Sequence, residues 1–375
     1  MSSNNANQTP SELVRENIRN LKPYQPGKPI EEVEREIGIT GAVKMASNEN
    51  PLGPSPLAIE AAAKVLGDCH LYPDGAAYYL RRDLAEMHGI DPQRLVFGSG
   101  CNEVIQMLIG AFCVPGRDQV LSHKYAFISY RVQTLAHGCE FVEADVTENL
   151  GCDVDALLAK VTERTRLILI ANPNNPTGAH LNRQQLEKLL AGVPSHAIVV
   201  IDEAYHEYAE VADDDYPKSQ DYAQDRPLLV TLRTFSKIYG LAGMRVGYGI
   251  CSSDVADFLN RLRRPFNVNL VGQEAARASL ADTAHVERSA KLAKIGIAKF
   301  RAAAPDLGVV AYPSLGNFVL IDVKRPAEEV YDALLREGVI VRPMAVWGLA
   351  THLRISIGTE AQNERCLAAL RSVLN

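Results

Sequence analysis

The segment from Thr234 to Arg245 holds residues with clear chemical potential. Thr234 and Ser236 carry hydroxyl groups, and Lys237 carries an amine. Arg245 follows eight positions after the lysine. Hydroxyl and guanidinium groups bind phosphate oxygens, and a lysine amine can act as a nucleophile. A lone lysine after a strand is usually only solvated, but this combination indicates a phosphate bound close to a reactive amine.

An acidic residue follows a second apolar run. Asp202 comes directly after Ile198–Ile201, and Tyr205 lies three residues further on. A carboxylate at this position is expected deep in a site, where it needs a cation or hydrogen-bond donors. The alternative, that Asp202 caps a helix, is equally well supported by the segment alone. The phenol of Tyr205 could point into the site that holds the Asp202 carboxylate.

A glycine-containing segment follows the apolar run Leu95–Phe97. Residues 98–103 (GSGCNE) precede a helical pattern, which places free backbone N–H groups where an anion could bind. A dinucleotide fingerprint would need a glycine where Glu103 stands, so a nicotinamide dinucleotide is not indicated. A strand–helix turn without a ligand is the alternative interpretation.

A loop rich in proline and asparagine follows Leu167–Ala171. Residues 172–178 (NPNNPTG) contain two prolines, which exclude both strand and helix, and asparagines that can form local hydrogen bonds. We predict a stiff surface loop. A plain turn would need only Asn-Gly, so the loop favours a functional role, in which it presents an amide side chain at the end of a strand.

The elements between these segments must bring them together. From about residue 54 to residue 250, helical stretches alternate with short β-rich runs, several of them apolar throughout. This alternation predicts an α/β fold with a doubly wound, mostly parallel sheet, whose ligands bind beyond the carboxyl ends of the strands. The predicted strands are Leu95–Phe97, Val120–Ser122, Leu167–Ala171, Ile198–Asp202, Leu228–Leu232 and Val246–Ile250.

The final third of the chain has a different pattern. A long helical region at about 271–304 precedes strand-like runs around 318–323, 339–341 and 353–357, with helices around 327–337 and 363–373. We expect a smaller α+β domain, completed by part of the N-terminal segment. The length of 375 residues also favours two domains. The predicted division is an N-terminal arm at 1–50, a large domain at 51–269 and a small domain at 270–375.

The composition excludes several classes of protein. Hydrophobic residues make up 47% and charged residues 22%, with a net charge of -6. No apolar run approaches the ~18 residues of a membrane span, and the polar N-terminus does not resemble a signal peptide. The basic cluster at 261–264 is more typical of a solvated helix face than of a nucleic-acid site. Seven scattered cysteines without zinc spacing favour reduced thiols in the cytoplasm and no bound metal.

The four segments together supply an anion-binding turn, an amide, a carboxylate and a lysine with phosphate-binding groups. Pyridoxal phosphate needs this set. The chain also resembles, over nearly its whole length, the histidinol-phosphate aminotransferase family of fold-type I pyridoxal phosphate enzymes. The resemblance rests on residues 21–27 (LKPYQPG), 46–53 (ASNENPLG), 72–75 (YPDG), 172–178 (NPNNPTG), 202–205 (DEAY), 236–237 (SK) and 353–358 (LRISIG).

The resemblance implies roles for individual residues. Lys237 would bind the cofactor covalently and move a proton, Asp202 would pair with the ring nitrogen, and Tyr205 would bind the ring hydroxyl. The remaining cofactor contacts would come from Asn175, Phe127, Cys101, Asn102, Thr234, Ser236, Arg245 and Tyr72 of the partner subunit. The substrate would contact Asn175, Arg342, Arg354 and Tyr24 of the partner subunit.

One position departs from the family pattern. Cys101 stands where the family usually has Ala or Ser. A backbone contact to phosphate tolerates this change. A helix N-terminus can lower the pKa of a thiol, which would make Cys101 sensitive to oxidation.

The resemblance also implies an activity. It is the interconversion of L-histidinol phosphate and 2-oxoglutarate with imidazole acetol phosphate and L-glutamate, by a homodimer with shared active sites. Guanidinium groups pair with phosphate and carboxylate alike, so Arg342 and Arg354 suit a site that binds both anions in turn. The alternatives are an aminotransferase for phenylalanine or tyrosine, a phosphothreonine decarboxylase, and a cofactor-loaded regulator, for whose DNA-binding module the chain has no spare residues.

Overall fold

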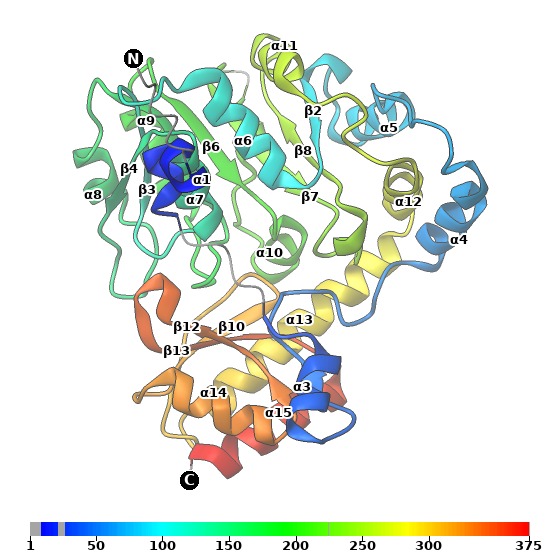
Figure 1. Ribbon diagram of the computed structural model, residues 1–375, viewed down its shortest axis with the longest axis vertical. Coiled ribbons are helices and arrows are strands. Elements are labelled where there is room, and N and C mark those ends of the chain that lie inside the picture. The colour runs from blue at the N-terminus through cyan, green and yellow to red at the C-terminus, as the bar shows by residue number, and fades with distance from the viewer. Residues whose placement is uncertain (1–8, 22–26, 224, 375) are drawn as a thin grey trace, which may run out of the picture.

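Two sheets organise the protein. The computed structural model describes residues 9–21, 27–223 and 225–374. A seven-stranded sheet has the order β2-β8-β7-β6-β5-β3-β4, and a four-stranded sheet has the order β12-β13-β10-β9. The seven-stranded sheet lies in the upper part of Figure 1 and the four-stranded sheet in the lower part.

The large sheet confirms the predicted mostly parallel architecture. Its neighbouring strands pair in parallel except at β8, which is antiparallel to both β2 and β7. The strand β4 was not predicted, because it lies at the edge of the sheet and most of its residues are only partly buried. The strands are β2 (Leu95–Gly98), β3 (Gln119–His123), β4 (Glu140–Ala144), β5 (Thr165–Ala171), β6 (Ile198–Asp202), β7 (Leu229–Thr234) and β8 (Gly247–Ile250).

Helices cover both faces of this sheet. Along β5, Leu167 and Leu169 pack into one hydrophobic cluster, and Ile168 and Ile170 pack into another on the opposite face. This double burial explains why the central strands are apolar throughout rather than alternating. The helices of this region are α4 (Pro56–Val65), α5 (Tyr78–His88), α6 (Cys101–Phe112), α7 (Ile128–Ala136), α8 (Val154–Ala159), α9 (Arg183–Gly192), α10 (His206–Ala212), α11 (Ser253–Leu262) and α12 (Leu270–Leu280).

The long helix predicted over 271–304 is two helices. α12 ends at Leu280, and α13 (Thr283–Ala303) begins after Asp282, whose side chain accepts a hydrogen bond from the backbone N–H of His285. Asp282 is therefore an N-cap that interrupts the helical pattern. α13 then runs from the large sheet to the small one, because Ala290 packs with the large-sheet core and Phe300 with the small-sheet core.

The small sheet is antiparallel and is covered by the C-terminal helices. Its strands are β9 (Val310–Ala311), β10 (Phe318–Asp322), β12 (Arg342–Met344) and β13 (Leu349–Ser356), and its helices are α14 (Ala327–Arg336) and α15 (Glu360–Leu374). Five 3₁₀ turns occur among the described residues: η1 (Leu66–Asp68), η2 (Pro92–Arg94), η3 (Ser219–Tyr222), η4 (Ala242–Met244) and η5 (Ala345–Trp347).

The N-terminal segment is divided between the two regions. α1 (Pro10–Leu13) and α2 (Glu16–Arg19) lie beside α7 in the large-sheet region, where the Asn17 amide donates to the Leu135 carbonyl at 2.8 Å. α3 (Ile30–Ile37) and β1 (Val43–Lys44) join the small sheet region. β1 pairs in parallel with β11 (Val339–Ile340), with Val43 opposite Val339. This pairing agrees with the expected contribution of the N-terminus, while the bounds at residues 50 and 269 stay a prediction. Throughout the described part of the chain, every helix is too short or too polar to span a membrane.

Candidate active site

The predicted chemical residues meet at the carboxyl edge of the large sheet. β5, β6 and β7 are parallel, so the residues that follow them lie at one edge. Asn175 follows β5, Asp202 ends β6, and Lys237 follows β7. One cavity at this edge is lined by Phe127, Ala171, Pro173, Asn175, Asp202, Ala204, Tyr205 and Lys237. Five of the predicted site residues therefore share it.

Asp202 is the most deeply buried acid of this cavity. It is 4% exposed, accepts a hydrogen bond from the Tyr130 hydroxyl at 3.0 Å and accepts another from the Ala204 N–H at 3.2 Å. Burial raises the pKa of Asp202 to about 6, and the Tyr130 hydrogen bond opposes this shift. α10 begins at His206, and its N-cap is Tyr205, so the helix-cap alternative for Asp202 is wrong. The carboxylate is available to a cationic partner.

Lys237 and Tyr205 lie next to each other. The Lys237 amine is 5.7 Å from the centre of the Tyr205 ring and donates a long hydrogen bond of 3.5 Å to the Ser47 carbonyl. The Tyr205 hydroxyl accepts a hydrogen bond from the Asn48 amide at 2.9 Å. The amine thus has a weak partner, which leaves it available for chemistry.

A phosphate site adjoins the cavity. β8 is antiparallel, so Arg245, which precedes it, lies at the same edge as Ser236, which follows β7. The Arg245 guanidinium donates to the Ser236 hydroxyl at 3.3 Å and to the Ser99 carbonyl at 3.4 Å. Gly100 has a positive φ of 76°, a backbone conformation that favours glycine, and the guanidinium lies directly against it.

The N-terminus of α6 completes this phosphate site. Its N-cap is Gly100, which has no side chain to accept hydrogen bonds from the first-turn N–H groups, including those of Cys101 and Asn102. Thr234 and Ser236 are buried beside Arg245 and supply hydroxyl groups. Backbone donors, hydroxyl groups and a guanidinium together form the set of donors that phosphate oxygens bind.

Cys101 does not have the lowered thiol pKa that its position predicted. The residue is half-buried, but its sulfur points inward and donates to the Arg233 carbonyl at 3.1 Å. Burial raises the pKa of Cys101 well above its usual range. Burial opposes the lowered pKa that a helix N-terminus favours, so the predicted sensitivity to oxidation is not supported.

The loop at 172–178 is buried, although it was predicted at the surface. Leu181 N–H donates to the Asn172 side chain at 2.7 Å, and the Asn174 amide donates to Thr177 at 2.9 Å, which satisfies polar groups inside the loop. The segment before β10 covers it, because Leu315 N–H donates to the Gly178 carbonyl at 3.2 Å. The loop therefore lies between the two sheets and presents Asn175 to the cavity.

Both predicted arginines lie on neighbouring strands of the small sheet. Arg342 of β12 and Arg354 of β13 are directly opposite each other in the antiparallel register, so their side chains share one face. Arg354 is 6% exposed and donates to the Asn175 side chain at 2.5 Å and to the Ala46 carbonyl at 2.6 Å. The small sheet thus brings the Arg354 guanidinium to Asn175 of the large-sheet cavity and places Arg342 beside Arg354 on the same face.

Tyr72, which was predicted to act in the site of the partner subunit, does not line this cavity. Tyr72 is 81% exposed and stacks on Phe266, with ring centroids 4.6 Å apart. This exposure fits a contact with another subunit. Tyr24 lies outside the described residues.

Two residues with direct contacts to the site had no predicted role. The Tyr130 hydroxyl binds Asp202, and Asn48 binds Tyr205. The spacing of Tyr130, three residues after Phe127 on one helical face, was an available signal, and the two rings are 5.6 Å apart. Asn48 lies in the 46–53 motif, which carried the resemblance without an assigned function.

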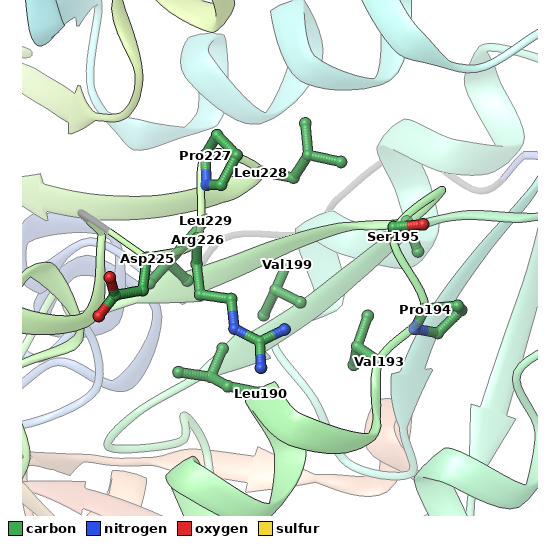
Figure 2. Close-up of a pocket in the computed structure, with 11 residues that line it drawn as sticks. Leu190, Val193, Pro194, Ser195, Val199, Asp225, Arg226, Pro227, Leu228 and Leu229 are labelled. Atoms are coloured by element: carbon green, nitrogen blue, oxygen red, sulfur yellow. The ribbon is translucent and has the colours of Figure 1, made fainter.

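A second cavity lies at the opposite, amino edge of the large sheet. Figure 2 shows Leu190, Val193 and Val199 lining it, together with Leu229 at the start of β7. Arg226 and Asp225 supply the charged groups around it. None of the predicted site residues contributes to this cavity, so the carboxyl edge is the candidate active site.

Comparison with known proteins agrees with this geometry. The family described as "Aminotransferase class I and II" matches residues 40–370. "Histidinol-phosphate aminotransferase 2" of Methylococcus capsulatus is 46% identical, with 95% of this chain and 97% of the relative covered. "Histidinol-phosphate aminotransferase" of an Anaeromyxobacter species is 46% identical, with 96% and 99% covered.

A solved structure shares the fold over nearly its entire length. It is that of histidinol-phosphate aminotransferase from Sinorhizobium meliloti in complex with pyridoxal-5'-phosphate. The TM-score is 0.87 at 27% sequence identity, and 98% of each chain is covered.

Proposed function

Because the chain belongs to the aminotransferase class I and II family and uses pyridoxal phosphate, we propose that it interconverts L-histidinol phosphate and 2-oxoglutarate with imidazole acetol phosphate and L-glutamate. The observation that supports this choice of substrate is the pair Arg342 and Arg354, which are directly opposite each other on neighbouring strands, with Arg354 bound to Asn175 of the cavity. Of the two amino donors, L-histidinol phosphate carries a phosphate, whereas L-glutamate carries carboxylates. Guanidinium groups can bind both.

The residues of the site fit the cofactor. Thr234, Ser236, Arg245 and the first turn of α6 would hold its phosphate, and Phe127 would stack on its ring. Asp202 would pair with the ring nitrogen, since a buried carboxylate needs a cation. Tyr205 and Asn175 would bind the ring hydroxyl. When bound, pyridoxal phosphate withdraws electrons from the carbon that carries the substrate amine.

Lys237 is the residue that we assign to proton transfer. Its amine lies in the cavity with only a long hydrogen bond to Ser47, so it can take a proton from the substrate carbon and return it. Asp202 would stay negatively charged when the protonated ring nitrogen of the cofactor faces it. Arg354 would bind the carboxylate of the amino acid, and its hydrogen bond to Asn175 holds that guanidinium at the cavity.

We propose a homodimer whose subunits share their active sites. The exposed Tyr72 supports this, together with exposed apolar side chains of α4, η1 and α5 and of the segments beside η1 and α12. They are Leu57, Ile59, Leu66, Leu71, Tyr78, Tyr79 and Phe266. We also propose a cytoplasmic location, which is supported by the seven free cysteines.

Mixed dimers test the sharing of sites. Lys237→Ala subunits combined with Tyr72→Phe, Tyr24→Ala subunits should recover activity, because each hybrid contains one site without a lesion. Confirmed hybrids that recover no activity would show that each site is built from one chain.

Substrate assays test the reaction. The purified protein should turn over L-histidinol phosphate with 2-oxoglutarate much faster than phenylalanine or tyrosine. Faster turnover of phenylalanine would assign an aromatic aminotransferase instead. Release of carbon dioxide without transfer of nitrogen to 2-oxoglutarate would assign a decarboxylase.

A further inference from the structure

The hairpin between β12 and β13 carries a residue that the proposed mechanism does not use. Trp347, in η5, is the only tryptophan of the chain. It packs beside a small hydrophobic cluster made of Leu320, Met344 and Leu349. Leu320 is opposite Arg354 in the antiparallel register, so this cluster lies on the face of the small sheet that carries Arg354. The Trp347 ring is therefore packed on one side against this cluster.

The other neighbour of Trp347 is a substrate-binding candidate. The Arg342 guanidinium carbon lies 6.0 Å from the centre of the Trp347 ring. A guanidinium near an aromatic face is attracted by the ring. Guanidinium groups bind phosphate through their N–H groups. Arg354, the register partner of Arg342, is already held by Asn175 and Ala46. Arg354 also lies 5.6 Å from the centre of the Phe318 ring, so each arginine has an aromatic neighbour, and that of Arg342 belongs to the hairpin.

The hairpin also reaches the large-sheet side of the site. A Cβ atom at Gly348 would lie 3.8 Å from the Tyr125 ring, and Tyr125 has a positive φ of 60°. The Asn174 amide donates to the Tyr125 carbonyl at 2.9 Å and supports this unusual conformation. A cavity between the two regions is lined by Trp347 and by Phe127, which also lines the active-site cavity.

We propose that Trp347 is a positioning residue for the phosphate end of the substrate, acting through Arg342. The ring limits the orientations of the guanidinium, so that its N–H groups face the anion that the donor carries away from its amine. This inference rests on the proposed function. The side-chain end of phenylalanine carries no anion, whereas that of histidinol phosphate carries a phosphate, so the effect is larger for histidinol phosphate.

Steady-state kinetics of two variants test the proposal. Trp347→Ala should raise KM for histidinol phosphate by about three- to tenfold, with little change in kcat and in KM for phenylalanine. Trp347→Phe keeps a ring face and should restore KM to within about twofold of wild type. Equal increases for both donors, a loss confined to kcat, or failure of Trp347→Phe to rescue would overturn the proposal.

An inhibition assay separates this proposal from the proposed function. If histidinol phosphate is not turned over, the proposed function fails, and inorganic phosphate becomes the probe in the holoenzyme, with whichever amino donor is used. Phosphate should inhibit wild type and Trp347→Phe similarly and Trp347→Ala about three- to tenfold more weakly. Equal inhibition constants in all three proteins, or no inhibition of wild type, would overturn the proposal.

The single tryptophan supplies a readout that does not depend on turnover. Adding inorganic phosphate to the holoenzyme should change the emission of Trp347, compared with chloride at equal ionic strength. The change should disappear in Arg342→Ala. An emission that does not respond in wild type, or responds equally in Arg342→Ala, would contradict the link between the two residues.

Discussion

The strands β6 and β7 end in two very different environments. At their carboxyl ends, Asp202 and Thr234 are buried polar residues beside Lys237. At their amino ends, Val199 and Leu229 line an apolar cavity with the side chains of α9 (Figure 2). Burying a polar group costs free energy, whereas burying an apolar group stabilises the fold. The comparison separates an edge that serves chemistry from an edge that serves stability.

Lys237→Ala should have the largest effect on activity and a small effect on stability. Its amine makes one long hydrogen bond, so unfolding should shift by no more than a few degrees. Loss of both proton transfer and covalent binding should reduce turnover by at least about 10⁴-fold. Turnover and thermal unfolding measure the two effects, and Lys64→Ala, in an exposed ion pair, is the control.

Borohydride reduction of the holoenzyme followed by peptide mapping identifies the modified lysine directly. The label should be found on Lys237. A label on another lysine would show that Lys237 is not the residue that binds the cofactor covalently.

Asp202→Asn should have the next largest effect on turnover. Breaking a buried ion pair costs about 3–5 kcal/mol, which corresponds to a loss of about 10²–10⁴-fold in turnover. Asp118→Asn is a matched control at the amino end of β3, where a buried carboxylate accepts from Val114 N–H and Arg117. That control should lose stability and keep its kcat. Similar kcat losses in both variants would break the distinction between the edges.

Leu229→Ala should show the opposite pattern at the amino edge. Truncation of a fully buried leucine costs about 2–5 kcal/mol of unfolding free energy. Turnover per folded molecule should stay within about twofold of wild type, because the side chain lies far along β7 from Lys237. Denaturant unfolding and kcat measure the two quantities. A large change in kcat would show that the amino edge also serves chemistry.

Asp202 should also make the stability of the cofactor-free protein depend on pH. Burial raises its pKa to about 6, against about 3.9 in an unfolded chain. Between these values the folded protein keeps a proton that the unfolded chain has released, so stability falls as the pH rises toward 6, by ~3 kcal/mol. Denaturant unfolding at pH 4 and pH 7 should show this fall relative to Asp202→Asn. A constant difference between the two proteins would contradict it.

The arginines should show the smallest effects. Arg354→Ala should reduce kcat/KM about ten- to a hundredfold in both half-reactions, because one charge-assisted hydrogen bond is worth about 1.5–3 kcal/mol. Arg342→Ala should affect histidinol phosphate more than phenylalanine. Half-reactions followed separately with each donor measure this. Equal effects of Arg342→Ala on both donors would assign it a general role.

Much of the site could be predicted because apolar runs mark where strands end. Asp202 and Lys237 follow such runs, and parallel strands bring their ends together. The contact of Tyr130 with Asp202 could not be predicted from the pattern, since it depends on how α7 packs on the sheet. β4 was missed because Glu140 and Glu143 interrupt its apolar character at the sheet edge.

The buried position of the 172–178 loop was missed for a related reason. Irregular backbone usually needs water for its polar groups, which favours the surface. Here Asn172 and Thr177 supply the partners from within the loop, and Leu315 closes it from the small sheet region. Partners from distant parts of a chain are not visible in a local pattern.

The pairing of β1 with β11 has a consequence for how the protein is made. Val43 leaves the ribosome early, whereas its partner Val339 leaves it near the end of synthesis. Until then the N-terminal strand has no partner, while β2 to β8 can already assemble. Contacts between such distant residues slow folding, because a long loop must close first. The small sheet region, which contains Arg342 and Arg354, should therefore be the last part of the nascent chain to fold.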